Sequence, residues 1–142
     1  NNLAKRRHVD DPTCVFCGEQ ESISHLFFDC VVSKLTWNLI SDILGITIGS
    51  DFESVGRWWI STNRHAAHDI VSTAILWTIW PYRNAICFQG KQWRNAQELW
   101  NGAIAPCRKW KILCREKCSL ELEQFIRAME RRQSELLRIA WR

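Results

Sequence analysis

The stretch Cys14-Val15-Phe16-Cys17, followed by His25 and Cys30, decides how the rest of this chain folds. Its spacing is C-x2-C-x7-H-x4-C. Three thiolates and one imidazole form the ligand set of a closed structural zinc site, and the two-residue gap lets the first two sulfurs reach one ion from a tight turn. Gly18 suits such a turn. The sequence therefore predicts one structural Zn2+ held by Cys14, Cys17, His25 and Cys30.

The predicted zinc site bears on both folding and chemistry. A structural zinc site forms only as its ligands come together, so its binding free energy, on the order of 10 kcal/mol in small fingers, is folding free energy. Four protein ligands leave no open position for a metal-bound water, so we do not expect hydrolysis at this ion. The sequence shows no other catalytic constellation, and we expect no catalytic residues and no enzymatic activity.

Composition narrows the class of protein. The chain has 142 residues, of which 46% are hydrophobic, enough for one domain with its own core. Seven cysteines cannot all pair as intrachain disulfides, which favours a reducing, intracellular location, nuclear or cytoplasmic. No run of apolar residues is long enough to predict a membrane span. A net charge of +4 permits nucleic-acid binding without arguing for it. The chain begins on Asn1 and not on methionine, so we expect processing or a longer parent protein.

Hydrophobic spacing predicts helices along most of the chain and no paired strands. The first follows Cys30 and ends at Gly45, and a short one follows Asp51 as its N-cap. The longest apolar stretch, from His65 to about Phe88, predicts the central helix. A further helix opens at Asn95 with a capping-box pattern, and an amphipathic helix runs over residues 120–141.

Two prolines stand inside these predicted helices. Pro81 is expected to kink or break the central helix near Trp80, because proline lacks a backbone donor and clashes with the preceding turn. Pro106 is expected to break or bend the next helix. The apolar pattern then resumes over residues 110–114.

Together these patterns predict an all-α fold. An N-terminal CCHC zinc knuckle leads into a tryptophan-rich helical domain with a long C-terminal amphipathic helix. We divide the chain into a basic lead-in and knuckle (1–30), a helical core continuous with it (31–118) and the C-terminal helix (119–142), all within one domain.

The knuckle and the sequence after it resemble a known module. The residues Cys14, Cys17, Glu21, His25-Leu26-Phe27-Phe28, Cys30 and Trp37, followed by Trp77-Thr78-Ile79-Trp80-Pro81-Tyr82-Arg83-Asn84, are similar to the zinc-binding domain at the C-terminus of plant LINE-type retrotransposon reverse transcriptases. Leu3-Ala4-Lys5-Arg6-Arg7 resembles the usual lead-in. The similarity covers roughly residues 3–100, and Pro81 departs from it because a charged residue is more usual there.

The resemblance implies a non-catalytic zinc module that acts near template RNA or target DNA. A helical chain of this length has no place for the polymerase palm. The alternative from a different class is a stand-alone, host-adopted protein that binds another protein, or itself, through the helical surface and the C-terminal helix.

Basic and aromatic side chains are the candidates for contact with RNA or DNA. The residues considered for contact with the phosphate backbone are Lys5, Arg6, Arg7, Arg83, Lys91, Arg94, Arg108, Lys109 and Lys111. A solvated surface is an equally good reading of these charges. Trp77 and Trp80 can stack on bases, but their apolar neighbours favour core packing.

Two further groups of residues are candidates for a protein interface and for a second metal site. For a protein partner the candidate interface is Trp110, Phe125, Met129, Leu136 and Trp141. Cys107, Cys114 and Cys118 can be imagined as a second metal site, but free cysteine more often behaves as a small buried hydrophobe, so no second ion is predicted.

Overall fold

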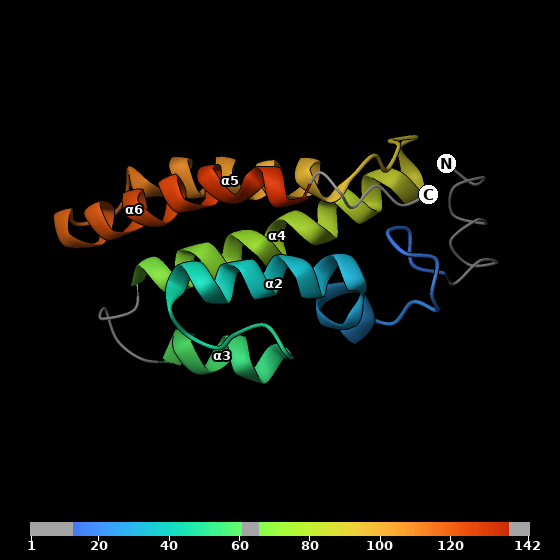
Figure 1. The fold of residues 1–142 in the computed structure, drawn as a ribbon, viewed down its shortest axis with the longest axis horizontal. Coiled ribbons are helices and arrows are strands. Elements are labelled where there is room, and N and C mark those ends of the chain that lie inside the picture. Colours follow the sequence, from blue (N-terminus) through green and yellow to red (C-terminus); the bar gives the residue numbers. More distant parts are fainter. Residues whose placement is uncertain (1–12, 61–65, 137–142) are drawn as a thin grey trace.

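The structure is a computed structural model that describes residues 13–60 and 66–136. These residues form a bundle of helices with no strand; an isolated bridge joins Thr13 to Gln20. The predicted all-α fold is confirmed. Figure 1 shows the elements in chain order: η1 (His25–Asp29), α2 (Val31–Leu44), α3 (Phe52–Ile60), α4 (Ala66–Phe88), α5 (Ala96–Lys111), α6 (Glu116–Arg132) and the 3-10 turn η3 (Gln133–Leu136).

Helix α4 lies at the centre of the bundle. It contacts α5, α6, α3 and η1, whereas α2 packs mainly against η1 and α6. Its buried side chains include Val71, Ile75 and Ile79, which are at most 1% exposed. They belong to one contiguous core that also contains the cysteines of the knuckle. The knuckle therefore packs on the helical core.

The helix ends follow the capping chemistry expected from the sequence. Gly45 ends α2 in the left-handed conformation, with φ of 74°. Asp51 Oδ1 accepts a 2.8 Å hydrogen bond from the Ser54 backbone N–H at the start of α3. Asn95 Oδ1 accepts a 2.9 Å bond from the Glu98 N–H at the start of α5. These three predictions are confirmed.

Of the kink or break predicted near Trp80, the break is wrong, because α4 continues through Pro81 to Phe88, and the kink stays a prediction. Proline at position 81 leaves the Trp77 carbonyl without its usual i+4 donor. Pro81 is exposed, and the Trp77 side chain is 64% exposed. Water on this face can hydrate the released carbonyl, so the helix tolerates the proline.

Of the break or bend predicted at Pro106, the break is also wrong, because α5 runs from Ala96 to Lys111, and the bend stays a prediction. The carbonyl that loses its donor here is that of Gly102. The Thr78 hydroxyl, from α4, lies 3.3 Å from this oxygen and also 2.7 Å from the Ala74 carbonyl. The hydroxyl of Thr78, on a neighbouring helix, thus approaches the Gly102 carbonyl, for which the surrounding sequence offers no hydrogen-bond donor.

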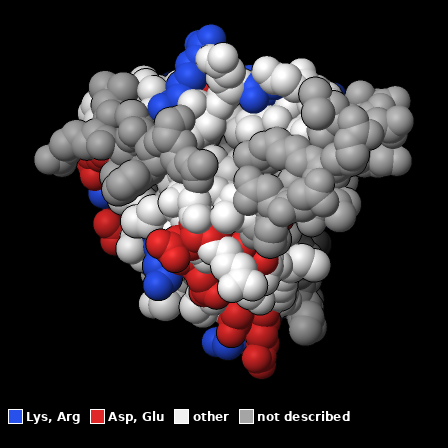
Figure 2. Space-filling model, turned by 90° about the vertical axis from the view of Figure 1, so that its right-hand side faces the viewer, with Lys and Arg blue, Asp and Glu red and all other residues white. Residues whose placement is uncertain are grey.

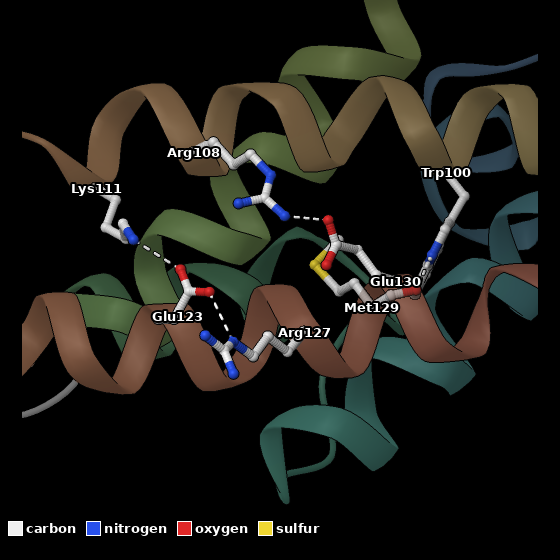
Figure 3. Close-up of polar contacts among 7 residues, drawn as sticks. All are labelled: Trp100, Arg108, Lys111, Glu123, Arg127, Met129 and Glu130. Carbon is white, nitrogen blue, oxygen red and sulfur yellow. Dashed lines mark hydrogen bonds and ion pairs between the residues drawn. The ribbon is translucent and has the colours of Figure 1, made fainter.

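Helices α5 and α6 form an antiparallel pair joined by a short turn. Trp100 Nε1 donates a 2.7 Å hydrogen bond to the Met129 carbonyl across this pair (Figure 3). The apolar residues after Pro106 do not continue a buried helix face. Ile112 and Leu113 are 81% and 84% exposed in the turn. Helix α6 begins at Glu116, earlier than predicted.

Among the described residues, no helix combines the length and the hydrophobicity that crossing a membrane requires.

Two glycines with positive φ make a matched test of the packing around Trp37. A Cβ on Gly49 (φ +99°) would stand 2.3 Å from the Trp37 ring, whereas one on Gly45 (φ +74°) would meet nothing within 4 Å. We expect Gly45→Ala to cost about 1 kcal/mol of unfolding free energy for the backbone alone. Gly49→Ala should cost about 2–5 kcal/mol, because overpacking adds to the backbone term. Urea unfolding of the two variants measures the difference, and equal losses would contradict the packing described.

Candidate metal centre

The first two cysteines lie in a tight loop closed by backbone hydrogen bonds. The Cys14 N–H donates to the Glu19 carbonyl at 2.6 Å, and the Gly18 N–H donates to the Cys14 carbonyl at 2.9 Å. Gly18 takes a φ of 84°, a conformation that glycine adopts without strain. This loop directs both sulfurs to the same side.

The other two ligands lie at the two ends of a single turn of π-helix, His25 as its first residue and Cys30 as its C-cap. His25 begins η1, and its N–H donates a 3.0 Å hydrogen bond to Ser22 Oγ. The Cys30 N–H donates to the His25 carbonyl at 2.7 Å, and Cys30 is at the same time the N-cap of α2. Single π-helical turns are uncommon and occur often at functional sites. Here the turn brings His25 and Cys30 to the same point.

The four predicted ligand atoms form one cluster. All of them lie within 4.8 Å of one another. Cys14 Sγ and Cys30 Sγ are 3.7 Å apart, and Cys17 Sγ and His25 Nε2 are 3.2 Å apart. Tetrahedral zinc with Zn–S bonds near 2.3 Å separates two thiolates by about 3.8 Å. The residues therefore fit one zinc ion with a closed coordination shell.

The environment of the thiols explains why a cation is needed. The pKa of Cys14 is lowered to about 5, chiefly by the hydrogen bond with Cys30 and also by the backbone N–H groups of Phe16 and Cys17, which together outweigh the opposing effect of burial. The same sulfur–sulfur bond raises the pKa of Cys30, and burial raises the pKa of Cys17. The protein alone therefore favours one thiolate. A divalent ion is what makes three thiolates at this spacing favourable.

A buried ion pair joins the knuckle to α4. Arg83 donates two hydrogen bonds to the Glu21 carboxylate, from Nε at 3.1 Å and from Nη2 at 2.7 Å. The side chains are 4% and 12% exposed. Bidentate pairing of this kind fixes orientation as well as distance. The loop between Cys17 and His25 is thereby held on the central helix.

Aromatic contacts also join the knuckle to the rest of the protein. Phe16 lies in the loop between the first two cysteines. Its ring packs edge-on against Trp93, with 4.8 Å between ring centroids, and lies tilted against Tyr82, with 6.2 Å between centroids. On the π-helical turn, Phe27 stacks with Trp80 at 6.1 Å. The metal loop thus contributes side chains to the main core of the protein.

Most of the described candidates for phosphate contact form ion pairs within the chain. Arg83 is the clearest correction, because it is 3% exposed and bound to Glu21. Lys91 pairs with Glu98 at 3.3 Å. Figure 3 shows two α5 cations that pair with α6, Lys111 with Glu123 at 2.7 Å and Arg108 with Glu130. Arg94 and Lys109 are exposed, and Lys5, Arg6 and Arg7 lie outside the described residues.

The prediction of core packing for the α4 tryptophans is wrong for Trp77, which is 64% exposed. Trp80 is 41% exposed, with one face on Phe27 and the Arg83 guanidinium 5.2 Å from its ring. The hydrophobic pattern of α4 misled the prediction because the helix is apolar around most of its circumference. Its solvent-facing side still carries these two rings.

The candidate partner interface is largely internal. Met129 and Leu136 are fully buried in the core of this chain, which excludes them as a surface for another protein. Trp110 and Phe125 are partly buried and pack against the same core. Trp141 lies outside the described residues.

No second group of three metal-ligating side chains occurs among the described residues. Cys107 is fully buried, and burial raises its pKa to about 12. Cys114 and Cys118 lie together without a third ligand.

The pairing of Glu21 with Arg83 was not predicted from the sequence, although both residues belong to the motifs described above. One indication of where Arg83 lies is present in the sequence. Trp77, Trp80 and Arg83 recur at three-residue intervals, which makes Arg83 a neighbour of Trp80 on the surface of a helix. Nothing local indicates that the acidic partner stands 62 positions earlier.

Comparison with known families matches residues 1–37 to the family described as zinc-binding in reverse transcriptase. The resemblance inferred from the sequence is thus confirmed for the zinc module. For residues 38–100 the resemblance stays a prediction. Searches of curated proteins and of solved structures found no match to this chain.

The ion pair gives a direct test of how the knuckle is held. Replacing Arg83 with Met removes two hydrogen bonds and a positive charge from the buried Glu21 carboxylate, which we expect to cost about 3–5 kcal/mol of unfolding free energy. The control is Arg127→Met, which removes an exposed partner of Glu123 and should change little, because solvent screens that pair. Denaturant unfolding of the zinc-loaded variants measures both. Similar losses in the two variants would show that Glu21 and Arg83 do not hold the knuckle.

Proposed function

We propose that this chain is a non-catalytic, zinc-stabilised accessory domain, similar to the zinc module of reverse transcriptases, that contacts the backbone of RNA or DNA. The observation that carries the proposal is the closed Cys3His cluster within the segment that matches that family. Four protein ligands leave the ion no open position for a reacting water, so its role is structural.

The charge distribution decides which cations can contact phosphate. Figure 2 views the molecule from the knuckle end, where Asp and Glu side chains gather below the centre of the described surface. This acidic patch repels phosphate, so backbone contact requires cations from other segments. We therefore assign backbone contact to the basic lead-in Lys5-Arg6-Arg7, which stands directly before the knuckle in the sequence, and to the exposed Arg94 and Lys109.

The exposed rings of α4 supply a second kind of contact. Trp77 and Trp80 lie one helical turn apart, and both present surface to solvent. Aromatic rings that face solvent can stack on unpaired bases, with little dependence on sequence. This arrangement favours a single-stranded nucleic acid.

A protein partner is the second candidate, and one observation favours it. Phe27 contacts both Trp80, at 6.1 Å, and Phe52, at 5.6 Å. Trp80 and Phe52 are 41% and 46% exposed, so α4 and α3 contribute to one aromatic surface, with the buried Phe27 of η1 in contact with both rings. Exposed aromatic surface is a common feature of protein interfaces.

Fluorescence anisotropy with a labelled single-stranded RNA, over a range of salt concentrations, tests the proposal. We expect Lys5→Gln/Arg6→Gln/Arg7→Gln to reduce the slope of log affinity against log salt by about 2, the counterion release of three phosphate contacts. Trp77→Ala should weaken binding by about 1–3 kcal/mol at every salt concentration, because stacking is lost.

Leu113→Ala, an exposed apolar residue in the α5–α6 turn, is the matched control and should bind like the parent chain. Failure of the zinc-loaded chain to bind any RNA or DNA at low salt would refute nucleic-acid contact. Retention of one defined protein after nuclease treatment, lost in Trp77→Ala, would instead support the second candidate.

A further inference from the structure

Two cysteines lie together at the end of the molecule opposite the zinc knuckle. Cys114 stands in the turn between α5 and α6, and Cys118 lies in the first turn of α6 (Figure 1). Their sulfurs are 3.2 Å apart, and neither residue belongs to the metal centre. Both thiols are partly exposed.

A pocket makes this pair of thiols accessible. It has a volume of about 700 Å3 and is lined by both cysteines, by Ala66, Ala67 and Ile70 from α4, and by Leu113. Its charged lining residues are Asp69, Arg115, Lys117 and Glu121. Both signs of charge are present, as they are in glutathione, which carries an ammonium group and two carboxylates.

We propose that Cys114 and Cys118 form a redox-active dithiol that exchanges with small-molecule disulfides of the glutathione class and closes to an intrachain disulfide. A disulfide has an S–S length near 2.05 Å, so the two sulfurs need to approach by only about 1.2 Å. Cys114 precedes the helix, and the turn can adjust to this movement without unwinding α6.

The two thiols have different roles. Burial, and then the neighbouring Cys114 sulfur, raise the pKa of Cys118 to about 12. The Cys118 thiol donates a hydrogen bond to the Cys114 sulfur at 3.2 Å, an arrangement that stabilises a thiolate on Cys114. Because the thiolate is the nucleophile in exchange, Cys114 attacks first. Cys118 is the resolving thiol, and the contribution of Cys114 to its raised pKa ends once Cys114 is bound in a mixed disulfide.

The exchange balances in atoms and electrons. Cys114 loses its proton to solvent, and its thiolate attacks one sulfur of glutathione disulfide. One glutathione thiolate leaves, and a mixed disulfide forms on Cys114. Cys118 then loses its proton and attacks Cys114 Sγ, which releases the second glutathione thiolate. The protein gives up two electrons and two protons, and glutathione disulfide is reduced to two molecules of glutathione.

The test treats the zinc-loaded chain with excess glutathione disulfide, followed by acid quenching, maleimide labelling and peptide mass mapping. We expect the loss of two maleimide labels and a disulfide between Cys114 and Cys118, with the zinc content unchanged. Cys107, which is fully buried, should stay reduced and serves as the internal control for folding. Persistence of both thiols in the reduced form, or their pairing with other cysteines, would overturn the proposal.

Single variants separate the two roles. Cys118→Ser should trap one glutathionyl group on Cys114, because no resolving thiol remains. Cys114→Ser should leave Cys118 as a free thiol. Equal modification of the remaining cysteine in both variants would refute the assigned order of attack. The mapping of the unsubstituted chain tests the disulfide itself, even if a variant folds poorly.

Discussion

The ion pair between Glu21 and Arg83 is the interaction on which the rest of the arrangement depends. Taking both charges out of water is favourable only where their geometry is fixed in advance. The zinc ligands provide that constraint on one side, because Glu21 lies in the loop between Cys17 and His25. The central helix α4 provides it on the other. The metal thus organises a contact between segments 62 positions apart in the sequence.

Features set by local chemistry could be predicted from the sequence. The zinc ligands follow from their spacing, and the helix caps at Gly45 and Asn95 follow from side-chain and backbone preferences that need no distant partner. The effect of Pro106 could not be predicted, because Thr78 approaches the carbonyl released there from another helix. The exposure of Trp77 could not be predicted either, because it depends on which side of α4 the other helices leave uncovered.

The structure also changes where function is to be sought. The basic stretch at the end of α5 is largely neutralised, because Arg108 and Lys111 pair with glutamates of α6. We therefore propose contact with a nucleic acid at the basic lead-in, at Arg94 and Lys109, and at the exposed rings of α4. Cys114 and Cys118 do not belong to the metal centre, so their oxidation and zinc binding can be followed separately.

Hydrogen exchange with and without zinc tests most directly whether the metal organises the core. When a chelator removes the ion, the account predicts that amide protection falls together in the knuckle, over residues 14–30, and in the part of α4 around Tyr82 and Arg83. Helices α5 and α6 should lose less, because their mutual contacts do not involve the knuckle. Loss of protection confined to residues 14–30, with α4 unchanged, would contradict the claim that zinc holds the knuckle and the central helix as one unit.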